Sequence, residues 1–145
     1  MVDYNKIVQL LYRWCAAHDA RDLQSLGAVV TADVEMFQKV GREAALNEIS
    51  ETYAKMPQQR RHVLTNTIIL EEEEGEVLTQ SYIQHYQIKD DKVWLNYTGI
   101  YRVLCVLQDG KWLIRRHEDF PDVTFRAEGA ADRPAAGVLQ STRVF

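Results

Sequence analysis

The chain has 145 residues and a net charge of −4, from 21 acidic and 17 basic side chains. This length fits one domain, because a second hydrophobic core would be too small. Hydrophobic residues make up 46% of the chain and charged residues 26%, as in ordinary globular proteins. The acidic balance excludes nucleic acid and an anionic membrane as main partners, since both require a basic surface.

Two features of the sequence concern its cellular compartment. Cys15 and Cys105 each lie inside an apolar segment and lack the spacing of a zinc site, so we expect two reduced core thiols. The N-terminal segment MVDYNKIVQLL contains an acidic residue and no apolar run of signal-peptide length. No stretch approaches the ~20 apolar residues of a membrane span. These features predict a cytoplasmic location.

The first sixty residues have mainly helical periodicity. Apolar side chains at spacings of three and four predict a first helix near residues 3–18. Asp22 is the expected N-cap of a short second helix. A short strand is predicted over residues 34–37. A third helical pattern follows Gly41 and should end before Pro57, because proline cannot continue a helix.

From residue 60 onward the apolar period changes to two, which is typical of strands. The expected turns are Glu74-Gly75, Lys89 to Asp91, and Asp109-Gly110, the last being a strong signal for a type I′ hairpin. Strands joined by such short turns form an antiparallel meander. The four predicted strands cover residues 61–70, 76–88, 93–107 and 111–120.

Helices followed by strands indicate an α+β fold. Strands of this length must twist and coil, so the antiparallel sheet should curl around the N-terminal helices as a cone with an open mouth. Such a concavity is a typical site for a small ligand. We expect this domain to occupy residues 1–122. The remaining residues, 123–145, lack periodicity and are predicted to be a tail that packs on a neighbouring subunit.

Four polar residues are candidates for chemistry. Asp19 lies at the C-terminal end of the first helix, where the helix dipole disfavours a negative charge, so its carboxylate needs a compensating donor or full solvent. His62, His85 and His117 lie in three different strands, and by alternation they can converge on the concave side of the sheet.

Each candidate also has a simpler interpretation. Asp19 can be explained by turn chemistry, because aspartate favours local hydrogen bonds there. A single histidine in a strand is often a hydrogen-bonded structural residue. No HxH or HxxxH spacing occurs, which disfavours a zinc site. The pattern alone therefore indicates an α+β domain with a pocket and no assigned metal.

Several strings, taken in order, resemble the SnoaL-like branch of the nuclear-transport-factor-2-like superfamily. They are RWCAAHDARDL (13–23), GREAALNEI (41–49), RRHVLTN (60–66), GIYRV (99–103) and DGKWLIRRH (109–117). The resemblance covers about residues 4–120. It implies the cystatin-like α+β barrel, in which a curled antiparallel sheet packs around N-terminal helices.

Within that branch, the chain is most similar to scytalone dehydratases and γ-hexachlorocyclohexane dehydrochlorinases. The resemblance implies that Asp19 and His62 form a catalytic dyad, and a His-x-x-Thr-Asn string spans His62 to Asn66. The cavity of the dehydrochlorinases contains an arginine, and the matching position in this chain is His117. The serine and asparagine of the dehydratases correspond to Gly99 and Tyr101. The second catalytic histidine of the dehydratases has no aligned match, although His85 lies two residues earlier on the same face.

A mechanism follows from the implied dyad. Asp19 would fix the tautomer of His62, whose free nitrogen would remove a proton beside a carbonyl or a leaving group. The expected reaction is an elimination or a double-bond isomerisation on an apolar, ring-containing small molecule, without a cofactor. The residues expected to contact this molecule are Trp14, Tyr53, Asn66, His85, Tyr97, Tyr101 and His117.

Two other functions stay open. The fold can serve as a non-catalytic ligand-binding or assembly domain, in which Asp19 and His62 form a structural hydrogen bond. It can also be a partner subunit, because β subunits of ring-hydroxylating dioxygenases share the Arg-His-x-x-(Thr/Ser)-Asn string and the Trp-x-Ile-x-Arg-Arg ending.

The outer face of the sheet is predicted to be partly apolar. Apolar residues occur at successive positions along the strand over 93–107, so each face of this strand contains some of them. A homodimer or homotrimer would cover the outer face. The alternating sets are Val93, Leu95, Val103 and Leu107, and Trp94, Ile100, Leu104 and Val106.

Overall fold

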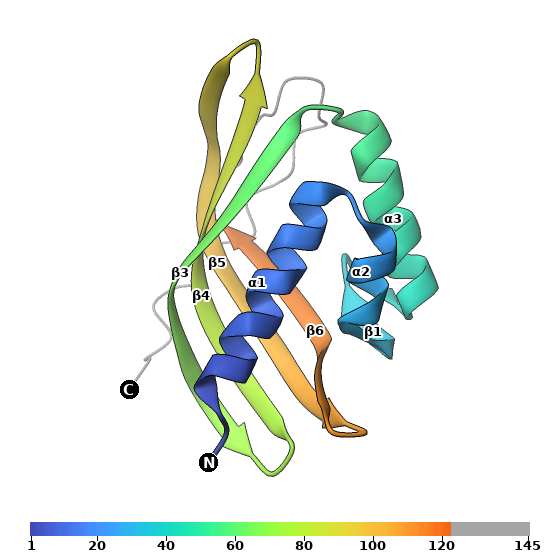
Figure 1. Ribbon diagram of the computed structural model, residues 1–145, viewed down its shortest axis with the longest axis vertical. Helices are drawn as coiled ribbons and strands as arrows, with labels where there is room; N and C mark the ends of the chain where they lie inside the picture. Colours follow the sequence, from blue (N-terminus) through green and yellow to red (C-terminus); the bar gives the residue numbers. More distant parts are fainter. Residues whose placement is uncertain (123–145) are drawn as a thin grey trace.

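The computed structural model describes residues 1–122, and the predicted tail lies outside the described residues. Three helices and two short strands precede four long strands, which confirms the expected α+β order (Figure 1). The elements are α1 (Tyr4–Ala20), α2 (Leu23–Ala28), β1 (Val30–Met36), β2 (Lys39–Val40), α3 (Arg42–Lys55), β3 (Gln59–Glu73), β4 (Glu76–Lys89), β5 (Lys92–Gln108) and β6 (Lys111–Pro121).

Local side-chain caps define the ends of the first two helices. The Asp3 carboxylate accepts a hydrogen bond from the Asn5 amide at 3.0 Å and begins α1. Arg21 adopts the left-handed conformation, with φ of 56°, and ends this helix. Asp22 caps α2 through the Ser25 amide at 3.0 Å, as the sequence predicted.

The four long strands form the predicted antiparallel meander, and the sheet order is β2-β1-β6-β5-β4-β3. Three hairpins have positive φ at both turn residues, which is the type I′ geometry. These residues are Phe37 and Gln38 (53° and 60°), Asp90 and Asp91 (52° and 58°), and Asp109 and Gly110 (50° and 75°). The predicted turns are therefore confirmed.

The first strand differs from its prediction in length and direction. β1 begins at Val30 rather than at Val34, and it pairs parallel to β6 through Val30–Ile114 and Glu35–Arg116. Every other strand pair in the sheet is antiparallel. The short β2 forms the sheet edge, and the sequence did not predict it.

The core lies between α1 and the concave face of the sheet (Figure 1). One face of α1 is buried, including Ile7, Leu11 and Trp14, each at most 3% exposed. The helix contacts β3 and β6, while α3 covers β1 and β2. Both cysteines are buried free thiols, as expected, and burial raises the pKa of each to about 12. No helix within residues 1–122 has the length and apolarity needed to span a membrane.

Irregular pairings in the long strands change which side chains face inward. In β3, pairing with β4 skips Asn66, whose φ is 52°. In β5, pairing skips Asn96, and in β6 it skips Arg115. The break in β6 buries both Ile114 and His117, although strict alternation would place them on opposite faces. Strict alternation would also place Arg115 on the same face as His117, but the pairing with β5 skips Arg115.

The hairpin between β4 and β5 extends beyond the helices (Figure 1). Three consecutive apolar residues there, Val93, Trp94 and Leu95, are 65%, 55% and 56% exposed. Val103, which the alternation grouped with Val93, is 2% exposed in the core. The exposed apolar residues of β5 therefore lie at its two ends, three at this hairpin and Leu107 (46% exposed) at the other end.

Candidate functional site

All four histidines of the chain line one cavity inside the cone. We call it the inner cavity, and its volume is about 60 Å³. Aromatic rings, histidines and a few polar groups surround it, which is a typical composition for a small-molecule site. Its lining residues are Trp14, His18, Phe37, Ile49, Thr52, Met56, Arg60, His62, His85, Asn96, Tyr97, Tyr101, His117 and Asp119.

Asp19 and His62 form a tight pair at the wall of the inner cavity. Oδ1 of Asp19 lies 2.6 Å from Nδ1 of His62. The same carboxylate accepts the backbone N–H of His62, at 3.1 and 3.2 Å from its two oxygens. The side chains are 14% and 9% exposed, respectively. The donors that a carboxylate requires at a helix C-terminus thus come from β3.

The residues after Asp19 hold it in position. Arg21 turns away from α1, and its guanidinium donates hydrogen bonds to the carbonyls of Tyr53, Met56 and Gln58 at 3.3, 3.0 and 2.9 Å. These carbonyls lie at and just after the end of α3, where helix carbonyls lack intrahelical partners. One side chain therefore ties the end of α1 to the segment that leads into His62.

The hydrogen bonds define the roles of two neighbouring imidazoles. The Asp19 carboxylate can only accept, so Nδ1 of His62 carries the proton and Nε2 presents a lone pair. Nδ1 of His85 lies 3.1 Å from the Asn96 amide nitrogen, which donates, so the proton of a neutral His85 is on Nε2. The two ring centroids are 4.6 Å apart. The His62 ring, which can accept a proton at Nε2, therefore packs against the His85 ring, which can donate a hydrogen bond from Nε2.

The other two histidines stay neutral because of their burial. Desolvation, followed by the charges of His62, His117, Arg60 and His85, holds the pKa of His18 well below its usual value. Desolvation lowers the pKa of His117 to about 3. Nε2 of His117 has no hydrogen-bond partner in the described structure.

Two tyrosines and an aspartate form the opposite side of the inner cavity. The Tyr97 hydroxyl donates to Oδ2 of Asp119 at 2.8 Å, and it lies 3.5 Å from the Tyr101 hydroxyl. Desolvation, with Tyr97 and Asp119 nearby, holds the pKa of Tyr101 well above its usual value. Tyr101 therefore keeps its proton at neutral pH and can donate a hydrogen bond.

The structure brings most of the predicted contact residues to the inner cavity, with two exceptions. Asn66 is exposed at the break in β3, which turns it away from the concave face. Tyr53 lies behind the lining, where its hydroxyl is 3.0 Å from Nδ1 of His18. Asn66 and Tyr53 therefore do not line the inner cavity, and their contact with a ligand stays a prediction.

Several lining residues were not predicted. Arg60 and Asp119 each lie two positions from a predicted histidine, so alternation along the strand would have found them. Asn96 lies at an irregular pairing and Phe37 lies in the unpredicted turn between β1 and β2. No periodic signal marks either residue.

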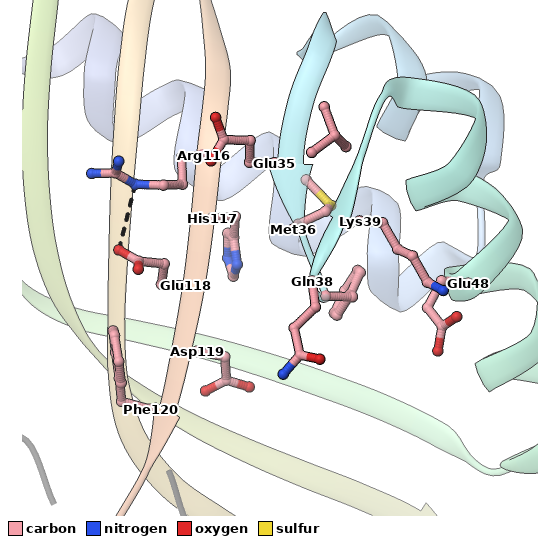
Figure 2. A pocket seen from close by; sticks show the side chains of 12 residues that line it. Glu35, Met36, Gln38, Lys39, Glu48, Arg116, His117, Glu118, Asp119 and Phe120 are labelled. Atoms are coloured by element: carbon pink, nitrogen blue, oxygen red, sulfur yellow. Dashed lines mark ion pairs between the residues drawn. The ribbon is translucent and has the colours of Figure 1, made fainter. Parts of the chain in front are cut away.

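A larger opening adjoins the inner cavity, and we call it the outer groove (Figure 2). It has a volume of about 710 Å³ and shares Phe37, His117 and Asp119 with the inner cavity. Figure 2 shows Glu35 and Lys39 from the first hairpin opposite the side chains of β6. Arg116 in this groove forms an ion pair with Glu118 at 3.6 Å.

The donor set does not indicate a metal site. Within residues 1–122, no group of three or more histidine, cysteine, aspartate or glutamate side chains is arranged to hold a metal ion. The imidazoles of the inner cavity instead contact aromatic rings, an amide and a carboxylate.

A curled sheet around a helix, with a polar cavity at its centre, defines the cystatin-like α+β cone class. Comparison with known families assigns the chain more closely: the SnoaL-like domain matches residues 1–118, and the chain belongs to this family. Comparison with curated proteins finds no significant match.

Solved structures support the same fold. Aln2 from a Streptomyces species is 21% identical, with a TM-score of 0.75, and the match covers 82% of this chain and 90% of Aln2. ActVI-ORFA from Streptomyces coelicolor is 20% identical, with a TM-score of 0.75 and coverage of 82% and 97%. A Catenulispora acidiphila structure in complex with S-DNPA is 24% identical, with a TM-score of 0.74 and coverage of 82% and 92%.

Proposed function

We propose that this protein is a cofactor-independent lyase or isomerase that acts on an apolar, ring-containing small molecule. The observation that carries this proposal is the 2.6 Å contact between Asp19 and His62 at the wall of the inner cavity. The SnoaL-like family includes polyketide cyclases and isomerases, and a structural neighbour was crystallised with the small molecule S-DNPA. Both facts support a small-molecule substrate.

His62 is the general base in this mechanism. Its Nε2 removes a proton from the carbon beside a carbonyl or a leaving group, and Asp19 stabilises the imidazolium that forms. The low exposure of both side chains strengthens this attraction, because the effective dielectric constant is lower than in water. General base catalysis of this kind contributes roughly 10²–10⁴-fold in rate.

Neighbouring donors stabilise the negative charge that develops on the substrate. The His85 ring, whose Nε2 carries the proton when it is neutral, packs against the His62 ring, and the Tyr101 hydroxyl stays protonated. Either donor can bind an enolate oxygen. Departure of hydroxide or halide from the next carbon completes an elimination. Return of the proton to another carbon completes an isomerisation.

Proton exchange tests the base without knowledge of the natural substrate. The protein is incubated in D₂O with a panel of cyclic ketones and β-hydroxy cyclic ketones, and NMR follows deuterium uptake beside the carbonyl and loss of the hydroxyl group. His62→Ala and Asp19→Asn should each lower the rate at least 100-fold, while circular dichroism stays close to that of the wild type. Activity that survives either substitution contradicts the proposed dyad.

The alternative is a ligand-binding domain in which the pair is structural. The observation that favours it is the hydrogen bond from the backbone N–H of His62 to Asp19, which also fastens β3 to α1. In that case Asp19→Asn would lower the free energy of unfolding by about 1–3 kcal/mol. No member of the ketone panel would then exchange with the wild type.

A further inference from the structure

The inner cavity and the outer groove differ sharply in size. The inner cavity, at about 60 Å³, holds only a few water molecules, whereas the outer groove measures about 710 Å³. Sites for small organic ligands usually measure ~300–1,000 Å³. A ring therefore fits the outer groove as it stands, but it reaches His62 only if the wall between the two spaces moves.

Three residues form that wall, because they line both spaces: Phe37, His117 and Asp119. His117 and Asp119 belong to β6, which pairs with β5 along most of its length. Phe37 lies outside any strand, in the turn between β1 and β2, and its side chain is only partly buried. Of the three wall residues, Phe37 is the one whose backbone is not held in a strand pair.

The hairpin that carries Phe37 lies at the edge of the sheet. β2 has two residues and forms the edge of the sheet, paired with β1 through Glu35–Val40 and Met36–Lys39. Phe37 and Gln38 have φ of 53° and 60°, in a region that disfavours residues with a side chain. Such strained positions concentrate at ligand clamps and switch regions.

We propose that Phe37 is a gate between the outer groove and the inner cavity and thereby sets the size of the molecules that reach His62. This inference rests on the proposed function for the role of His62, but not for the binding event itself. Displacement of the Phe37 ring joins both spaces into one site, with its reactive end at the inner cavity.

The charges of the outer groove indicate the rest of the ligand. Its lining contains four carboxylates, on Glu35, Glu48, Glu118 and Asp119, against the two cations Lys39 and Arg116. Arg116 is already paired with Glu118. The groove therefore suits an uncharged polar or cationic substituent on the ring rather than an anionic one.

Binding of aromatic probes tests the gate directly. Fluorescence titration and stopped-flow mixing with 2-naphthol, 2-(aminomethyl)naphthalene and naphthalene-2-sulfonate give affinities and association rates. A closed gate reduces apparent affinity by the fraction of molecules that are open. Phe37→Ala should therefore bind 2-naphthol at least 10-fold more tightly, with faster association. Phe37→Trp should slow association.

Phe120→Ala is the matched control, because Phe120 lines the outer groove but not the inner cavity. Phe37→Leu is a second variant that preserves an apolar side chain, and near-ultraviolet circular dichroism verifies that each variant is folded. Unchanged affinity in both Phe37→Ala and Phe37→Leu, or an equal gain in Phe120→Ala, overturns the gate. Absence of 2-naphthol binding in every variant overturns it as well.

The probes also separate this inference from the catalytic proposal. The sulfonate should bind at least 10-fold more weakly than the amine; equal affinities contradict the assignment of a cationic or neutral substituent. These outcomes depend on binding alone. A gated site with no deuterium exchange in the ketone panel would leave Phe37 as the gate of a binding protein, whereas exchange without a Phe37 effect would leave the dyad intact.

Discussion

The guanidinium of Arg21 donates a 3.0 Å hydrogen bond to the carbonyl of Met56, and this contact joins the end of α1 to the end of α3. Arg21 follows Asp19 by two residues, and Met56 precedes His62 by six. The two halves of the proposed dyad come from segments far apart in the sequence. Arg21 is therefore a positioning residue for Asp19.

Arg21→Ala should lower the free energy of unfolding by about 3 kcal/mol, because three carbonyls lose a charged donor. Urea denaturation measures this change. Deuterium exchange with the ketone panel should also slow about 10-fold, since loss of alignment slows the reaction. Arg13→Ala is the control, because Arg13 is exposed on the same helix. An equal effect of both substitutions contradicts the positioning role.

The hydrogen bond from Asn96 to His85 gives a prediction about tautomers. A carboxylate at position 96 would accept a proton from Nδ1 of His85, so Asn96→Asp would move the proton of a neutral ring from Nε2 to Nδ1. Nitrogen NMR of the histidine rings should show this exchange of tautomers.

The rate of deuterium exchange should fall 10- to 100-fold in the same variant, because the donor beside His62 is lost. Asn47→Asp adds the same charge on α3, away from the inner cavity, and should leave both the spectrum and the rate unchanged. A normal rate with a changed tautomer would exclude His85 as a hydrogen-bond donor to the substrate.

The sequence predicted the parts of the structure that depend on regular patterns. Helical spacing located α1 and α3, alternation located the meander, and turn chemistry located the hairpin at Asp109 and Gly110. The pairing of Asp19 with His62 was implied by the family resemblance, whereas the helix end alone indicated only that the Asp19 carboxylate needs donors or solvent. The geometry now supplies those donors, whereas the catalytic role of the pair stays a prediction.

The parts that were missed depend on irregular pairing. A skipped residue in β3 turns Asn66 outward, and another in β6 brings His117 inward. Neither irregularity involves glycine, and only Asn66 belongs to a residue type that tolerates positive φ. Phe37 was expected to end the strand over residues 34–37, but the chain turns one residue earlier, after Met36. The contacts of Tyr53 were also unpredictable, because they depend on how α3 packs beside α1.

Acid should destabilise the folded protein before its carboxylates are protonated. The pKa of His117 is about 3 in the folded state and its usual value is 6.5. Between these values the unfolded chain binds a proton that the folded chain excludes, so stability is fully present above 6.5 and is lost as pH falls. His18 contributes in the same direction.

Urea denaturation between pH 7 and pH 5 measures the effect. Each of these histidines should lower the free energy of unfolding by roughly 1.4 kcal/mol per pH unit below about pH 6. His117→Gln should reduce the slope of unfolding free energy against pH by the contribution of one histidine, because glutamine does not titrate. A slope that is unchanged in this variant would show that His117 is protonated in the folded state.

Gly99 is required by the close approach of β5 and β6. A Cβ atom at this position would lie 2.5 Å from the carbonyl oxygen of Phe120 and 2.9 Å from Cα of Pro121. Both are backbone atoms, so the clash cannot be relieved by a side-chain rotation. This packing explains why the position that corresponds to a dehydratase serine contains no side chain here.

Gly99→Ala should therefore force the strands apart and lower the free energy of unfolding by about 1–3 kcal/mol. The end of β6 carries Asp119, so the Tyr97 hydrogen bond should lengthen as well. Gly27→Ala is the matched control, because its Cβ would meet only side-chain atoms, the flexible end of Leu46 at 3.2 Å and Cδ of Arg42 at 3.7 Å. Alanine also favours a helix by about 1 kcal/mol over glycine, which offsets that contact. Thermal and urea denaturation measure the stability of both variants. If Gly99→Ala is as stable as Gly27→Ala, β6 shifts without loss of pairing and the prediction is contradicted.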